Sequence, residues 1–111
     1  MRFELCVDSI DGVRAAHAAG ADRVELCADL LEGGTTPNLG AIRIARAVEG
    51  LRLHVMIRPR GGDFLYDDDE VSAMAADIAA AKAEGAGAPG EYTRTATSAR
   101  RIRAVMERAV S

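Results

Sequence analysis

Apolar and polar residues alternate in three short stretches of the chain, residues 3–7, 22–27 and 53–57. Alternation with a period of two is typical of β-strands, because successive side chains point to opposite faces of a sheet. In each stretch one face is aliphatic, and the other face carries polar or sulfur-containing side chains. We therefore predict three strands whose aliphatic faces are covered by helices.

Each predicted strand is followed by a stretch with helical spacing. These stretches are residues 11–19, 37–48 and 67–83, and a glycine soon follows each one, where glycine commonly ends a helix. Three strand–loop–helix units with short connections indicate a parallel sheet in an α/β protein. Polar side chains on one face of each strand favour the lumen of a barrel over an open sheet covered on both faces. We predict the α/β class, as a partial TIM-type (β/α) barrel with three βα units and a C-terminal helix.

Two of the predicted helices have recognisable starts. Thr36 is a candidate N-cap, because its hydroxyl can accept a backbone hydrogen bond, and Pro37 then occupies the first helical position. Acidic residues at positions 67–70 crowd the start of the third helix, where carboxylates complement the positive end of the helix dipole.

The pattern changes after Gly85. We assign residues 1–86 to three βα units, residues 87–90 to a joint with no following strand, and residues 91–111 to a C-terminal amphipathic helix. Apolar residues lie at helical spacing in this last segment, and arginines fill its other faces. We interpret the arginines as a solvated face rather than as a surface for nucleic acid or membrane.

Length and charge restrict the function. A chain of 111 residues suffices for one small domain. A net charge of −3, with no basic stripe and only two tyrosines and two phenylalanines, argues against a nucleic-acid partner. No apolar stretch reaches membrane-spanning length, and the N-terminus does not have the pattern of a signal peptide. We therefore expect no membrane partner, a cytoplasmic location, and reduced thiols at Cys6 and Cys27.

The polar face of the three strands contains candidate metal ligands. Cys6 and Cys27 fall at equivalent places near the ends of adjacent strands, which lie about 4.8 Å apart in a parallel sheet. Thiolate and thioether ligands select Cu(I), and imidazole also suits copper. The two cysteines are thus candidate copper ligands, with Met56 and His54 as weaker candidates from register alone. The alternative is that the cysteines are small buried hydrophobes and Met56 fills the core.

A second candidate site lies at the end of the third strand. Loops after parallel strands carry the chemistry of many α/β proteins. Glu25, Arg58, Arg60 and Asp63 would line a barrel mouth, where arginines suit phosphate or carboxylate and a carboxylate can act as a base. These residues predict binding of an anionic small molecule by an enzyme of unknown reaction. The alternative is that Glu25 forms a structural ion pair with Arg58 or Arg23. No nucleophile–base pair is evident, so no catalytic residue is assigned.

Three segments together resemble the CutC copper-homeostasis family: RVELC at 23–27, EGGTTPNLG at 32–40 and IRPRGGDFLY at 57–66. The order and spacing of the segments also match, and IRPRGGDF is specific to that family. The resemblance implies a single TIM-type barrel, longer than this chain, that binds copper through cysteines. These cysteines carry over to Cys6 and Cys27.

After residue 86 the chain resembles a different part of the family. The segment EYTRTATSARRIRAVMERAV, residues 91–110, resembles the C-terminal helix of the family. The chain is therefore similar to a family member with an internal deletion, which lacks later motifs built around a Phe-His-Arg. A sheet shortened in this way would have two open edges, and open edges favour association. This leaves a third hypothesis, an inactive fragment that forms homo-oligomers through its sheet edges.

Overall fold

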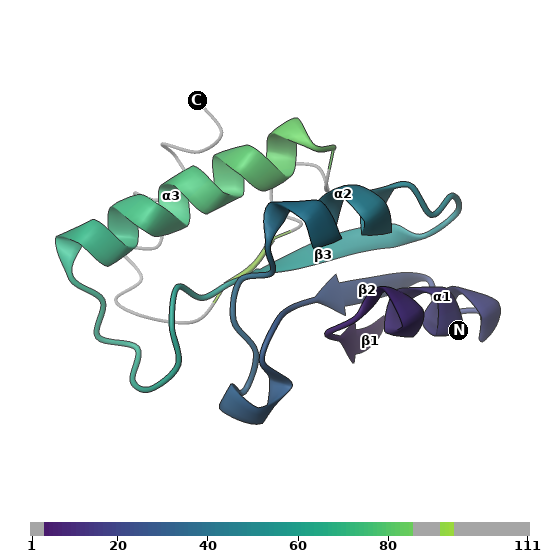
Figure 1. Ribbon diagram of the computed structural model, residues 1–111, viewed down its shortest axis with the longest axis horizontal. Coiled ribbons are helices and arrows are strands. Elements are labelled where there is room, and N and C mark those ends of the chain that lie inside the picture. The colour runs from purple at the N-terminus through teal and green to yellow at the C-terminus, as the bar shows by residue number, and fades with distance from the viewer. Residues whose placement is uncertain (1–3, 86–91, 95–111) are drawn as a thin grey trace.

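The computed structural model of the protein describes residues 4–85 and 92–94. The described strands form one parallel sheet in the order β1-β2-β3-β4 (Figure 1). The strands are β1 (Glu4–Val7), β2 (Arg23–Leu26), β3 (Arg52–Ile57) and β4 (Tyr92–Arg94). The helices are α1 (Ile10–Ala18), α2 (Leu39–Arg46) and α3 (Asp68–Ala83), and a short 3₁₀ helix, η1 (Leu30–Glu32), follows β2. The three predicted βα units are confirmed.

The core lies between the sheet and its helices. Figure 1 shows α2 and α3 on the same side of β3. The aliphatic side chains of β2 and β3 are buried there against helix side chains. From the strands these are Val24, Leu26, Leu53, Val55 and Ile57, and from the helices they include Val13, Ile42, Met74 and Ile78. The predicted alternation of faces is therefore confirmed for these two strands, and their polar face is left for a site.

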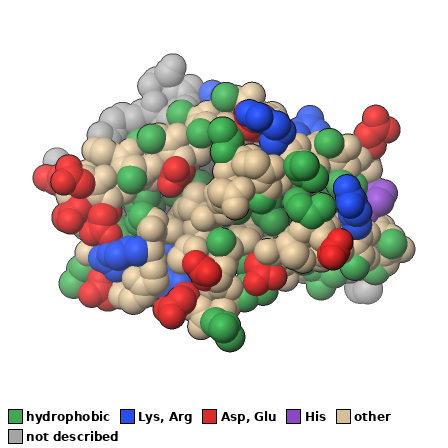
Figure 2. All heavy atoms as spheres, viewed as in Figure 1, with side chains coloured by type: hydrophobic (Ala, Val, Ile, Leu, Met, Phe, Trp, Pro, Cys, Tyr) green, Lys and Arg blue, Asp and Glu red, His purple; other side chains and the backbone are tan. Residues whose placement is uncertain are grey.

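Helix α3 begins where its sequence predicts. The Asp67 side chain accepts a hydrogen bond from the Glu70 N–H at 2.8 Å, and the Glu70 side chain accepts one from the Asp67 N–H at 3.2 Å. This reciprocal capping box satisfies two backbone donors that have no partner within the helix. Figure 2 shows acidic side chains gathered over this end of α3.

The predicted N-cap of the second helix is wrong. Helix α2 is capped by Asn38, whose side chain accepts from the Ala41 N–H at 2.8 Å. Thr36 instead bonds to the end of β3: its hydroxyl accepts from the Arg58 N–H at 2.8 Å, and its own N–H donates to the Arg58 carbonyl at 2.9 Å. This tertiary pairing holds Thr36 outside the helix, so α2 starts after Pro37.

The predicted absence of a strand after the joint is also wrong. Residues 92–94 form β4, which pairs in parallel with β3 through Val55 and Tyr92. Residues 92–94 are therefore extended where the sequence predicted a helix. Tyr92 and Thr93 are residue types that favour strands, and β3 offers an edge with backbone groups to pair. The joint and the rest of the predicted C-terminal helix lie outside the described residues.

Within the two described ranges, the helices are too short or too polar to cross a lipid bilayer.

Candidate metal centre

The two cysteines meet on the polar face of the sheet. Cys6 lies in β1, Cys27 directly follows β2, and their Sγ atoms are 3.7 Å apart. The strand register differs from the prediction, because Cys6 is aligned with Glu25 and Cys27 lies two residues further along. The Cys27 N–H donates to the Val7 carbonyl at 3.0 Å, which continues the ladder beyond β2. The sulfurs therefore approach along a diagonal rather than directly across the strands.

The two thiols have different surroundings. Cys27 is 2% exposed, and its Sγ lies 3.5 Å from the Val7 carbonyl oxygen, to which it donates. Cys6 is exposed, and its Sγ lies 3.6 Å from Glu25 Oε1. One sulfur is thus fixed in the interior, and the other is accessible and donates a hydrogen bond to a carboxylate.

The environment raises the pKa of both thiols. Burial is the main cause for each. The pKa of Cys27 rises to about 12, because the hydrogen bond with Cys6 adds to the effect of burial. Both groups are therefore protonated thiols at neutral pH, and a metal ion that binds them must displace their protons.

The structure distinguishes the two weaker candidate ligands. Met56 is 7% exposed and lies next along β3 after Val55, the partner of Leu26, so it is aligned with Cys27. His54 is aligned with Glu25 instead. Its Nδ1 atom lies 3.1 Å from Glu4 Oε2, and the same oxygen lies 2.8 Å from Arg23 Nε. His54 thus belongs to a polar cluster, whereas Met56 lies beside Cys27.

This donor set fits a soft ion. Among the described residues, no group of three or more His, Cys, Asp or Glu side chains is placed to hold a metal ion. A structural zinc site would need four such ligands. Two thiols with a thioether beside them suit Cu(I), which soft sulfur ligands select.

At the predicted barrel mouth, Arg58 joins two loops. Its side chain is buried, and its Nη1 atom donates to the carbonyls of Glu32 and Gly34. Its Nη2 atom donates to the Gly62 carbonyl at 3.1 Å, and the guanidinium lies over the Phe64 ring. Arg58 therefore connects the loop after β2 to the loop after β3.

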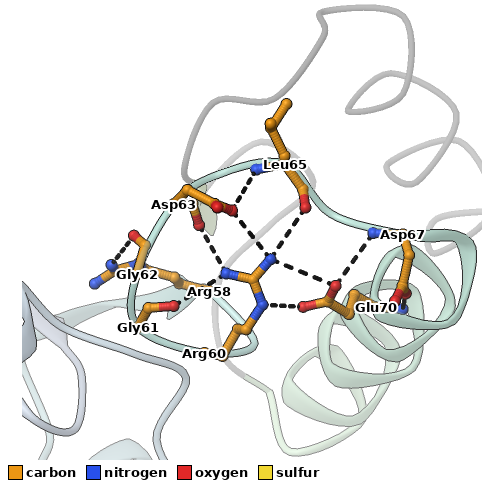
Figure 3. A network of polar contacts seen from close by, with 8 residues as sticks. All are labelled: Arg58, Arg60, Gly61, Gly62, Asp63, Leu65, Asp67 and Glu70. Carbon is orange, nitrogen blue, oxygen red and sulfur yellow. Dashed lines mark hydrogen bonds and ion pairs between the residues drawn. The ribbon is translucent and has the colours of Figure 1, made fainter.

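Arg60 organises the loop after β3 (Figure 3). It donates to three carbonyls of that loop and forms ion pairs with Asp63, at 3.2 Å, and with Glu70. The hydrogen bond to Glu70 raises the pKa of Arg60, and the pKa of Asp63 is lowered by the Leu65 N–H and then by Arg60. The guanidinium of Arg60 is therefore taken up by contacts within its own loop and with Glu70 in the first turn of α3.

The predicted mouth residues do not converge on one point. Arg60 and Asp63 are together, but Glu25 contacts Cys6 and has no contact with either arginine of the mouth in the described structure. The alternative ion pair of Glu25 with Arg58 or Arg23 is wrong, because Arg23 pairs with Glu4 and Arg58 with carbonyls. In the described part of the chain, the four predicted mouth residues therefore do not form a single convergent site.

Sequence reasoning missed one residue of this region, Gly34. It has φ +93°, and a Cβ atom built on it would lie 3.4 Å from Cys27 Sγ and 3.4 Å from Met56 Cε. Two adjacent glycines permit backbone angles closed to other residues, but the sequence holds no sign of which side chains this loop covers.

Comparison with known proteins identifies the family. The model of the CutC family matches residues 1–109. A CutC family protein from Mesorhizobium japonicum is 58% identical over 88 residues, which are 79% of this chain and 33% of that protein. The human copper homeostasis protein cutC homolog is 52% identical over 84 residues, which are 76% of this chain and 31% of that protein.

The fold agrees with these matches. The crystal structure of a CutC protein from Streptococcus agalactiae superimposes with a TM-score of 0.84 at 30% identity, and the match covers all of this chain and 56% of that one. The chain spans about a third of the length of the curated relatives it matches. The family model covers nearly the whole chain, and we conclude that this chain belongs to the CutC family.

Proposed function

We propose that this chain takes part in copper homeostasis by binding Cu(I) between the thiols of Cys6 and Cys27. The observation that carries the proposal is the distance of 3.7 Å between the two Sγ atoms. A metal–thiolate bond of about 2.3 Å lets one ion contact both sulfurs at that separation. The human and mouse relatives carry the name of copper homeostasis proteins, which agrees with this assignment.

The surroundings of the two sulfurs suit an ion that is carried rather than permanently held. Cys27 is buried and fixes one side of the site, whereas Cys6 is exposed and gives access from solvent. Glu25 lies beside Cys6, and its carboxylate accepts a hydrogen bond from the thiol. We place this activity in the cytoplasm, where thiols stay reduced and available to copper.

The proposal is tested by competition for Cu(I) against a chromogenic chelator, without oxygen. Replacing either thiol, in Cys6→Ser or Cys27→Ser, removes one soft ligand and is expected to weaken binding by at least the roughly tenfold that loss of an outer partner costs. Circular dichroism of each variant establishes that the fold is retained.

A matched control separates this site from ordinary thiol chemistry. Ser72 lies exposed on α3, and Cys6→Ser combined with Ser72→Cys restores the number of thiols but not the pair. We expect the double variant to bind Cu(I) as weakly as Cys6→Ser. Recovery of the affinity, or an unchanged affinity in Cys6→Ser, would remove the proposed site.

We also propose that the chain self-associates through the free edge of β1. The side chains of Glu4, Leu5 and Cys6 are exposed, unlike most of those in β2 and β3. The described sheet ends at this strand, so one row of its backbone groups is available to a second copy.

A further inference from the structure

We infer that Met56 supplies a third sulfur ligand to the Cu(I) site, and that Gly34 leaves the space in which the three sulfurs meet. This inference rests on the proposed binding of Cu(I) by Cys6 and Cys27. It names a ligand and a loop position that the cysteine pair alone does not require.

The first support is strand register. Leu26 pairs with Val55, so the next residues, Cys27 and Met56, are aligned on neighbouring strands and point to the same face. Neighbouring strands lie about 4.8 Å apart, which is within reach of a flexible methionine side chain. Since Cys27 Sγ is already 3.7 Å from Cys6 Sγ, Cys27 lies between the exposed thiol of β1 and the strand that carries Met56.

The second support is the position of Gly34. A Cβ atom on this residue would lie 3.4 Å from both Cys27 Sγ and Met56 Cε, so the ends of the two side chains reach the same small space. The Gly34 carbonyl accepts from Arg58 Nη1 at 2.9 Å, which holds the loop over that space. Glycine suits this position because it adopts φ +93° without strain and places no Cβ atom against the two sulfur-bearing side chains.

The third support is the chemistry of the alternatives. A thioether is a soft, neutral ligand that favours Cu(I) and adds no charge to two thiolates. His54 is the other candidate, but its Nδ1 faces Glu4 and it is aligned with Glu25 instead of Cys27. Met56 is therefore the better placed of the two.

The test compares two methionine variants. Met56→Leu keeps an apolar side chain of similar volume but removes the thioether. Met74→Leu is the matched control, because Met74 is a buried methionine of α3 in the core on the opposite face of the sheet. In chelator competition we expect Met56→Leu to lose at least roughly tenfold in Cu(I) affinity, by analogy with the loss of outer ligand partners, and Met74→Leu to bind as the unchanged chain does.

X-ray absorption of the copper-loaded, unchanged chain gives a second readout that does not depend on how a variant folds. Three sulfur neighbours around copper, falling to two in Met56→Leu, support the inference. Two sulfur neighbours in the unchanged chain, with equal affinity in Met56→Leu, overturn it and leave the cysteine site intact. Equal losses in both methionine variants also overturn it, because they indicate a packing effect. If the unchanged chain binds no Cu(I), the proposed function and this inference fail together.

Discussion

At the scale of single residues, the site combines two thiols of unequal accessibility. The thiolate is the reactive form of cysteine, and burial raises the pKa of Cys27 to about 12 while Cys6 is exposed. We expect iodoacetamide at pH 8 to label Cys6 well before Cys27 in the folded, metal-free chain, as measured by peptide mass spectrometry. In denaturant both should be labelled at similar rates. Equal rates in the folded chain would contradict the unequal burial of the two thiols.

The sequence predicted the shared face of these residues but not their contacts. Alternation alone places Cys6, Cys27 and Met56 on the polar face, because it follows from the two-residue period of a strand. The two-residue offset between the cysteines depends on how β1 and β2 align, which is set by hydrogen bonds such as Cys27 N–H to the Val7 carbonyl. The distinction between Met56 and His54 depends on Glu4, a residue of β1 that contacts His54 across the sheet.

At the scale of helices and strands, the sequence predicted those features that depend on contacts between residues close together in the chain. The start of α3 was predictable because Asp67 and Glu70 cap each other three residues apart. The start of α2 was not, because Thr36 binds the backbone of Arg58, which is distant in sequence. Strand β4 was missed for the same kind of reason, since its pairing with β3 is a tertiary interaction that overrides the helical pattern at residues 92–94.

The capping box gives a prediction for helix stability. Asp67→Ala removes the side-chain acceptor for the Glu70 N–H, and we expect the free energy of unfolding to fall by about 1 kcal/mol. Urea denaturation followed by circular dichroism measures this loss. Asp69→Ala is the control, because Asp69 is also an acidic residue of the first turn and is exposed. We expect it to cost only a few tenths of a kcal/mol through the helix dipole. Equal losses would mean that charge, and not the cap, stabilises this end.

At the scale of the whole molecule, the repeat of strand, loop and helix predicted a parallel α/β sheet, and the match to a CutC structure agrees with it. The mouth residues were harder to predict, because sequence order places Arg58, Arg60 and Asp63 in one loop without showing their partners. The guanidinium groups of Arg58 and Arg60 bind backbone carbonyls of the loops after β2 and β3, and Arg60 also binds the Asp63 carboxylate. The motif IRPRGGDF thus holds the ends of the strands together, and through Gly34 it also positions the loop over the proposed copper site.

The free edge of β1 leads to a prediction about assembly. If a second copy pairs with this edge, assembly couples stability to concentration, and the melting temperature of the metal-free, reduced chain should rise with protein concentration. Circular dichroism gives the melting temperature, and light scattering gives the mass in solution. A chain that remains monomeric at every concentration, with a constant melting temperature, would exclude the edge as an interface.

Two leucines test whether that edge is the surface involved. Leu5 lies in β1 and is 41% exposed, and a lysine on an edge strand opposes pairing with another edge. Leu5→Lys should therefore shift the mass toward the monomer and remove the concentration dependence. Leu31 is fully exposed on η1 and is not part of β1, so Leu31→Lys makes the same chemical change without altering the edge strand. If both variants dissociate the assembly equally, general apolar contact drives it. If only Leu5→Lys does, copies pair through β1, the strand that carries Cys6, and assembly would then bring the exposed thiols of two copies to one interface.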